Sequence, residues 1–401
     1  MPIKWWEQFP TALRLITKTR FLASMGAGGV IYLTPLVFNK TNFSATQIGY
    51  GLAIAALIGT ISRLISGLLL DNGVNALKLI KATAIIASLG DLTLFNAQDY
   101  NSFLYGELLI GVSAGIYWPS IELAVPISCA DNFPSSKGFA LGRTADALGI
   151  SLGAAIGTLA AWTGFIRFIY IFDIICLCLL FRLLINQNFK YKKEIKSNQI
   201  KISFQEIFIW LKALSPILLI SLLATGILSS LQSALPLDLV QGGLRRPPLS
   251  EGWSSGLIAI QLFLLVILQW PTGRWISGKN IKFGLRISLL FLGLGCLALG
   301  LSSLFYSGVI MVLLAQLPIA FGLAAFLPTA TEAIISETDT EHLGLSMALF
   351  SQCFAISAFA APIVGGRLLD LEGNGLHLWT GFFILCIFAL ILFNRISYLD
   401  R

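Results

Sequence analysis

Charge is scarce in this chain: only 12% of its 401 residues are Asp, Glu, Lys or Arg, whereas 56% are hydrophobic. Soluble domains carry roughly twice that share of charge. Apolar runs recur without a polar face, as in Ser254–Trp270 and Phe382–Phe393, neither of which contains a charge. Because about 20 apolar helical residues span the hydrocarbon core of a bilayer, these runs predict a polytopic α-helical membrane protein.

Histidine and paired cysteine motifs are equally scarce. The chain has two histidines and six cysteines, with no C-x-x-C spacing, so we predict no metal site and no cofactor. It also lacks a polar stretch long enough for a soluble catalytic domain, and we predict that it is not an enzyme. The net charge of +7 is attributed to loops at the membrane surface, not to nucleic-acid binding.

About twelve apolar segments are long enough to span a bilayer. The first is the hydrophobic run Phe21–Phe38, which we interpret as a retained helix and not as a cleaved signal peptide. The other predicted spans are 45–70, 74–95, 102–128, 138–162, 165–186, 214–238, 253–276, 283–303, 307–335, 343–369 and 376–394.

Lys and Arg are distributed unevenly between the connections. If the N-terminus is cytoplasmic, about 21 of the 27 fall on the cytoplasmic side, as the positive-inside rule expects. The sequence therefore predicts a multi-pass protein of the plasma (inner) membrane with both termini in the cytoplasm.

The chain is predicted to contain two related halves. One basic, hydrophilic break divides it into an N-terminal six-helix bundle (1–186), a cytoplasmic linker (187–211) and a C-terminal six-helix bundle (212–401). One offset aligns Gly67 with Gly273 and Ile150-Ser151 with Ile356-Ser357. A shared offset at two distant places favours a duplicated six-helix unit, a frequent design in transporters.

The end of the second predicted span carries the segment Gly67-Leu68-Leu69-Leu70-Asp71-Asn72-Gly73. It resembles, in part, the G-x-x-x-D-[RK]-x-G loop of the major facilitator superfamily. Asn72 replaces the usual basic residue, and Gly73 comes one place early. The repeat copy begins at Gly273. The resemblance implies two six-helix halves that rock about a central site, with Gly67, Asp71, Gly73 and Gly273 forming the conformational loop motif.

Three glycines recur every four residues in the fifth predicted span: Gly149, Gly153 and Gly157. This pattern resembles the glycine-rich fifth helix of the proton-driven drug exporters within that superfamily. The alternative interpretation is close packing of two helices without any meaning for export, because small residues at this spacing let helices approach.

Ionisable groups at membrane depth are costly and mark functional candidates. Glu107, Trp118 and Glu122 share one face of the fourth predicted span. We interpret Glu107 as a protonatable group that faces the substrate path, and a pairing with a nearby cation is the alternative. The candidates for the path of substrate and protons are Glu107, Trp118, Tyr32, Gln232, Gln316 and Asp146.

A second set of charges is predicted near the inner end of the N-terminal half. Arg63, Glu122 and Arg143 lie there together with Asp146. Two acids and two bases can compensate one another, so the sequence favours a structural ion-pair cluster over a proton relay. Asp91 and Asp173 are weaker candidates, because the third and sixth helices are peripheral in the resembling fold.

One motif argues against nucleotide-driven transport. The segment from Gly273 to Asn280 nearly reads as a phosphate-binding loop, but Asn280 stands where the magnesium-binding hydroxyl belongs. The segment also follows a membrane span and not a buried strand. An ion gradient is therefore the expected energy source.

These observations predict a secondary active transporter that works by alternating access. The favoured mechanism is proton-coupled efflux, by antiport, of a small amphipathic or drug-like compound. Uptake of a nutrient, sugar or organic anion is the alternative, and a membrane sensor or scaffold without transport is an alternative of another class. The expected partners are a small-molecule substrate, protons and the lipid bilayer, with no nucleic acid, and the expected state is a monomer.

Overall fold

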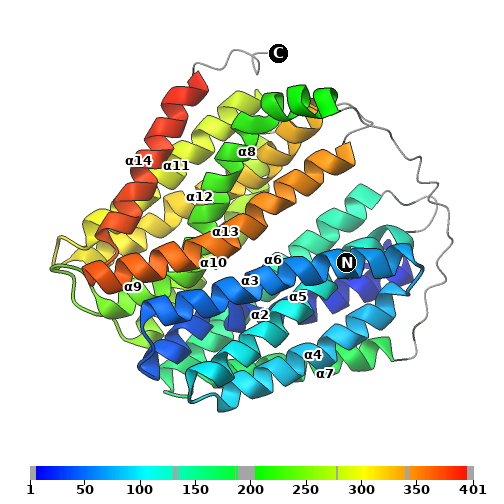
Figure 1. Cartoon of the computed structure of the whole chain (residues 1–401), viewed down its shortest axis with the longest axis horizontal. Coiled ribbons are helices and arrows are strands. Elements are labelled where there is room, and N and C mark those ends of the chain that lie inside the picture. The colour runs from blue at the N-terminus through cyan, green and yellow to red at the C-terminus, as the bar shows by residue number, and fades with distance from the viewer. Residues whose placement is uncertain are drawn as a thin grey trace. The chain divides into compact units, whose positions relative to one another are not determined.

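The computed structural model describes residues 6–129, 133, 135–185, 187, 204–276, 279–338 and 343–394. Every regular element in these ranges is a helix, and no strand occurs among them (Figure 1). Twelve of the helices are long and one is short, which confirms the predicted all-α fold. They are α2 (Thr11–Lys40), α3 (Ala45–Asp71), α4 (Ala76–Asn96), α5 (Tyr100–Ser128), α6 (Ser135–Trp162), α7 (Phe168–Leu184), α8 (Phe204–Ser233), α9 (Leu235–Gln241), α10 (Glu251–Ile276), α11 (Ile281–Ser302), α12 (Gly308–Ser336), α13 (Leu343–Glu372) and α14 (Leu376–Asn394).

Two predicted spans differ from the helices that form. The first helix begins at Thr11, ten residues before the apolar run, so several polar residues lie inside it. The predicted span 214–238 is divided at Ala234 into α8 and α9. Pro236 lies in the first turn of α9, a position where the missing N–H of proline breaks no helical hydrogen bond.

The helices have the length and composition of membrane spans. Within the described ranges, nine helices are long and apolar enough to cross a bilayer. The shorter or more charged helices are α4, α7 and α14: α4 contains Lys78, Lys81 and Asp91, and α7 has 17 residues. The chain is therefore a multi-pass membrane protein.

Helix packing repeats between the two halves of the chain. In the N-terminal half α2 packs against α6 and α7, and α4 packs against α5 and α7. In the C-terminal half α8 packs against α13 and α14, and α11 packs against α12 and α14. The corresponding helices make the same pairings within each half, as the predicted pseudo-symmetry of two six-helix bundles requires.

The glycine-rich face of α6 lies against α2. A Cβ on Gly149 would come within 2.7 Å of the carbonyl oxygen of Phe21, and one on Gly153 would collide with the backbone at Met25. Gly157 likewise faces the side chain of Leu33. The glycine spacing is thus explained by close approach of two helices and needs no connection with export.

The chain divides into two compact units. The first lies within Met1–Phe43, Gly51–Ile195 and Glu251–Ala259, and the second within Ser44–Tyr50, Lys196–Ser250 and Ile260–Arg401. The predicted linker 187–211 lies largely outside the described residues, although α8 already begins at Phe204. The predicted boundaries of the two halves stay a prediction.

The loop motif between α3 and α4 is a turn that needs glycine at one position. Helix α3 ends at Asp71, and Gly73 has a φ of +84°, a left-handed conformation that glycine adopts readily. The Asp71 side chain lies outside the described residues, and the space around Gly67 and Gly273 is open. The latching role of the motif remains a prediction.

Helix α5 begins at an aspartate cap whose charge gives a testable pH dependence. The Asp99 carboxylate accepts hydrogen bonds from the backbone N–H of Ser102 at 3.0 Å and from its hydroxyl at 2.8 Å. These bonds stabilise the charged form and lower the pKa of Asp99 below its usual 3.8. The stabilisation is therefore complete above the unfolded-state pKa and is lost as the pH falls through the lowered value.

We expect the melting temperature of the detergent-solubilised protein to fall more for wild type than for Asp99→Asn as the pH drops from 6 to 3. Asparagine keeps an acceptor at the cap but cannot titrate. The difference between the two melting curves should be constant above pH 5 and should shrink below pH 4. A difference that is independent of pH over this range would contradict the assignment.

Candidate functional site: a buried charge network

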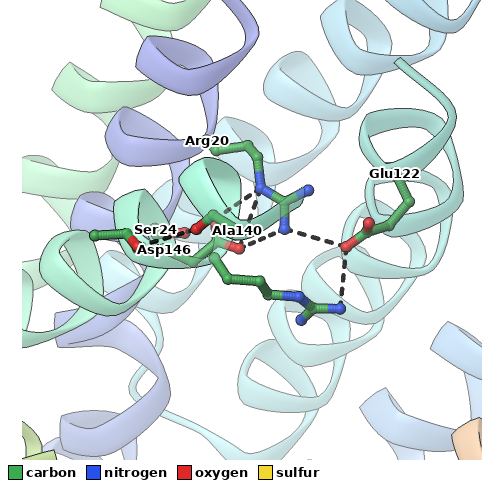
Figure 2. A network of polar contacts seen from close by, with 7 residues as sticks. Arg20, Ser24, Glu122, Ala140 and Asp146 are labelled. Carbon is green, nitrogen blue, oxygen red and sulfur yellow. Dashed lines mark hydrogen bonds and ion pairs between the residues drawn. The ribbon is translucent and has the colours of Figure 1, made fainter. Parts of the chain in front are cut away.

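The first unit contains a network of charged side chains from three helices (Figure 2). Helix α2 supplies Arg20 and Ser24, α5 supplies Glu122, and α6 supplies Asp146. Arg20 lies nine residues after the start of α2, more than two helical turns inside the helix. Its side chain is only 1% exposed, which makes it one of the largest fully buried side chains.

Arg20 and Asp146 form the centre of the network. The guanidinium donates through Nη2 to Asp146 Oδ2 at 2.5 Å and through Nε to both carboxylate oxygens at 3.1 and 3.2 Å. The Ser24 hydroxyl donates to Asp146 Oδ1 at 3.0 Å. A planar guanidinium on a carboxylate gives strong, directional, charge-assisted hydrogen bonds, so the pair fixes α2 against α6.

Glu122 extends the network towards a more open region. Arg20 Nη2 also donates to Glu122 Oε1 at 3.1 Å, and Arg143 Nη2 lies 3.4 Å from the same oxygen. The Glu122 side chain is 29% exposed and that of Arg143 is 65% exposed. The Arg20–Asp146 pair of the network is therefore buried, whereas the Glu122–Arg143 pair is accessible to solvent.

The four charges of the network balance. Arg20 and Arg143 offset Glu122 and Asp146, as expected for charges held at low dielectric. The guanidinium of Arg20 also lies 5.9 Å from the centre of the Trp118 ring, within reach of a cation–π attraction. Because Arg20 donates to two carboxylates, protonation of one leaves the other to hold the guanidinium.

The predicted inner cluster is found only in part. Glu122, Arg143 and Asp146 lie together, whereas Arg63 on α3 makes no ion pair among the described contacts and its buried Nε has no hydrogen-bond partner there. The cation at the centre is Arg20. In the sequence it stands just before the first apolar run and resembles one more basic residue of the cytoplasmic end.

Glu107 lies apart from this network on the same helix. It is 4% exposed, but eleven residues separate it from Trp118, a rise of about 16 Å along α5. Asp91 on α4 lies near enough to both Glu107 and Asp173 on α7 for their charges to interact. The oxygens of Asp91 meet no protein donor among the described residues. The sequence indicates Asp91 and Asp173 only as minor candidates and does not place them beside Glu107.

The remaining candidates lie elsewhere: Tyr32 and Gln316 are buried, and Gln232 is partly buried. Tyr32 on α2 is 4% exposed. Gln232 on α8 and Gln316 on α12 belong to the second unit. The Gln316 amide donates to the Val312 carbonyl one turn earlier in its own helix, at 2.7 Å. This contact gives Gln316 a local role in α12.

The second unit has its own buried ion pair, which the sequence did not indicate. Asp238 on α9 accepts hydrogen bonds from Arg246 at 3.0 Å, from the backbone N–H of Gly375 at 2.8 Å and from the Trp379 indole at 2.9 Å. Both charged side chains are fully buried. Arg246 also donates to Ser302 at 2.6 Å. The sequence favours an exposed loop for Arg246. The structure buries it against Asp238, eight residues earlier, and Ser302, 56 residues later.

The described side chains offer no basis for metal chemistry: no group of three or more His, Cys, Asp or Glu within them could hold a metal ion. The network instead offers titratable carboxylates and a guanidinium, which suit the binding of protons or of a charged or polar small molecule.

Solved structures of membrane transporters share this fold over nearly their full length. The chain is similar to the nucleoside transporter NupG (TM-score 0.78, 12% identity, 96% of this chain and 98% of that chain). It is also similar to a POT family transporter in complex with 5-aminolevulinic acid (TM-score 0.79, 15% identity, 98% and 97%). A third is the peptide transporter POT in complex with sulfate (TM-score 0.76, 13% identity, 97% and 94%).

No model of a protein family matches the sequence, and no curated protein matches it. The chain nevertheless shares its fold with these solved structures. These neighbours are transporters and not enzymes. At such low identity the likeness carries the fold alone, so substrate, direction and coupling are questions for the proposal that follows.

Proposed function

We propose that the protein is a secondary active transporter of the major facilitator type that works by alternating access. The observation that carries this proposal is the match of fold over 96% to 98% of the chain to structures of nucleoside and peptide transporters. The buried charge network around Arg20 supports it, because charges at membrane depth are costly and mark functional positions in transporters.

The substrate class that we favour is a small polar nutrient taken up by the cell. The structural neighbours transport nucleosides or peptides, and none of those described above is a drug exporter. The glycine spacing that suggested an exporter is explained by the packing of α6 on α2. Drug efflux is therefore the weaker alternative.

Protons are the proposed coupling ion. Glu107 is an acidic side chain buried within a span, only 4% exposed. The Arg20 network provides two further carboxylates that can change protonation without losing every partner. We place the protein in the plasma membrane with both termini in the cytoplasm, as the Lys and Arg distribution predicts, and we propose that it acts as a monomer.

Counterflow tests the proposed function without a need to know the coupling ion. Proteoliposomes containing the purified protein are preloaded with unlabelled uridine or alanyl-alanine and are given the same compound with a radioactive label outside. A transporter should take up label faster than protein-free vesicles, and preloading should accelerate the uptake. Equal uptake with and without protein, for these two and for a wider panel of nutrients, would contradict the proposal.

We predict that Glu107→Gln abolishes accumulation driven by an imposed pH gradient while counterflow stays near the wild-type rate. Glutamine keeps the shape of the side chain but cannot carry a proton. The matched control is Glu251→Gln, a carboxylate in a partly exposed pair with Lys40, which should keep both activities. If Glu107→Gln accumulates substrate as the wild type does, Glu107 is not the coupling group. Asp146 would then be the next candidate.

A further inference from the structure

The first unit has a cavity at the ends of three helices. Its volume is about 480 Å³, within the usual size range of small-molecule sites. Helix α2 ends at its rim with Lys40, α4 ends beside it at Asn96, and α7 begins there at Phe168. Since two of these helices end and one begins at the cavity, it lies at the level where a bilayer passes from acyl chains to headgroups.

The lining of the cavity combines apolar rings with positive charge. Its apolar lining residues are Phe95, Phe165, Phe168, Val37, Ile166 and Ile171. Phe165 is 76% exposed, a high value for phenylalanine and a typical one for a side chain at the membrane interface. The lining includes no acidic side chain. A ligand that fits must therefore have both an apolar part and an anionic part.

Arg167 supplies a positive charge that no carboxylate neutralises among the described contacts. Its guanidinium donates to three carbonyl oxygens at the end of α4: Leu94 at 3.1 Å, Phe95 at 2.5 Å and Ala97 at 2.6 Å. These acceptors are neutral dipoles. They and the Phe38 ring, 5.7 Å from the guanidinium carbon, fix the side chain of Arg167 in the wall of the cavity.

Lys40 adds a second positive charge at the rim of the cavity, on a side chain that can change its position. Its ammonium lies 3.2 Å from Glu251 Oε2, and the side chain is 49% exposed. Exposed pairs of this kind contribute little to stability, so Lys40 can turn towards an anion in the cavity at small cost. Arg167 and Lys40 together leave the cavity with a net positive charge.

We propose that this cavity binds an anionic phospholipid, with the phosphate near Arg167 and Lys40 and the first part of an acyl chain against the phenylalanines. Charge complementarity selects an anionic headgroup, and the position at the helix ends places a lipid beside the cavity at all times. A soluble anion would satisfy the charges but not the apolar lining.

Native mass spectrometry of the full chain in detergent tests the proposal with phosphatidylglycerol and phosphatidylcholine as the probes. We expect phosphatidylglycerol to be retained preferentially. Lys40→Gln should weaken its binding about fivefold, the effect of one basic residue near an anionic lipid surface. Ile171→Trp, which fills the cavity without changing charge, should also weaken it. The control Lys78→Gln removes an exposed cation at the other end of α4 and should have no effect.

Two results would overturn the proposal. The first is equal retention of the two lipids, or equal loss of phosphatidylglycerol in Lys40→Gln and Lys78→Gln. The second is displacement of bound lipid by the same concentration of glycerol 3-phosphate, which would identify the cavity as a site for a soluble anion. The purified protein should instead keep its lipid when that soluble headgroup is added.

Discussion

Arg20→Gln should destabilise the protein by about 3–5 kcal/mol, the usual cost of removing one partner from a buried ion pair. Glutamine leaves the carboxylates of Asp146 and Glu122 without the cation that Arg20 provides, and Asp146 lies in a place with little access to water. We expect a large loss of monodisperse protein in size-exclusion chromatography and a much lower melting temperature in detergent.

The comparison variant for this prediction is Arg143→Gln. Arg143 contacts the same network through Glu122 at 3.4 Å, but its side chain is 65% exposed. Its removal should therefore cost no more than about 1 kcal/mol. A similar loss of stability in Arg20→Gln and Arg143→Gln would show that the burial of the side chain does not determine the cost of its removal.

A double variant distinguishes the loss of the Arg20–Asp146 interaction from the separate effects of changing each residue. Arg20→Gln combined with Asp146→Asn removes one charge of each sign and leaves Glu122 with Arg143. The double variant should be more stable than Arg20→Gln alone, because the stranded carboxylate is gone. Strictly additive losses would show that the two side chains do not stabilise each other.

Asp238→Ala should have an effect of similar size in the second unit, again about 3–5 kcal/mol. It leaves the buried Arg246 guanidinium without its counter-charge and removes the acceptor for the Trp379 indole and the Gly375 N–H. These donors connect α9 to the start of α14 and to the segment before it. We therefore expect the packing of α9 against α14 to loosen. The melting temperature and the folded yield are the measurements.

The matched control for Asp238 is Glu372→Ala in the same unit. Glu372 lies 3.2 Å from His377, and both side chains are largely exposed. Its loss should stay within about 1 kcal/mol. The combined variant Asp238→Ala with Arg246→Leu should recover part of the stability lost in Asp238→Ala. Equal melting temperatures for wild type and Asp238→Ala would contradict the buried-pair account.

The fold could be predicted from the sequence because its cause is local. A bilayer span needs about 20 apolar residues in succession, and each such run in the chain corresponds to a helix. The repeat could also be recognised from the sequence, because residues such as Gly67 and Gly273 occupy equivalent positions near the ends of their spans. The break in the span at Ala234 was not predicted, although Pro236, two residues later, is a residue type that marks helix boundaries.

The candidate site was harder to predict because ion pairs are tertiary contacts. Asp146 and Glu122 were recognisable as acids inside apolar spans, but their common partner is more than 100 positions away. The signal for Arg20 was present only in part: an acid in a glycine-rich helix needs a cation, and the glycines indicate that another helix comes close, but only the structure identifies that helix as α2. Asp238 and Arg246 gave no comparable signal, since Asp238 stands at the end of an apolar run and Arg246 stands beside Pro247 in a predicted loop.

The most direct test of the central claim is concentrative transport by the purified protein. Proteoliposomes with an acidic exterior and a neutral interior are given a labelled nucleoside or dipeptide that shows counterflow. The account predicts accumulation inside above the external concentration, which collapses when a protonophore removes the gradient and which Glu107→Gln cannot produce. Equilibration of the substrate to the external concentration, with no response to the gradient or to the protonophore, would contradict it.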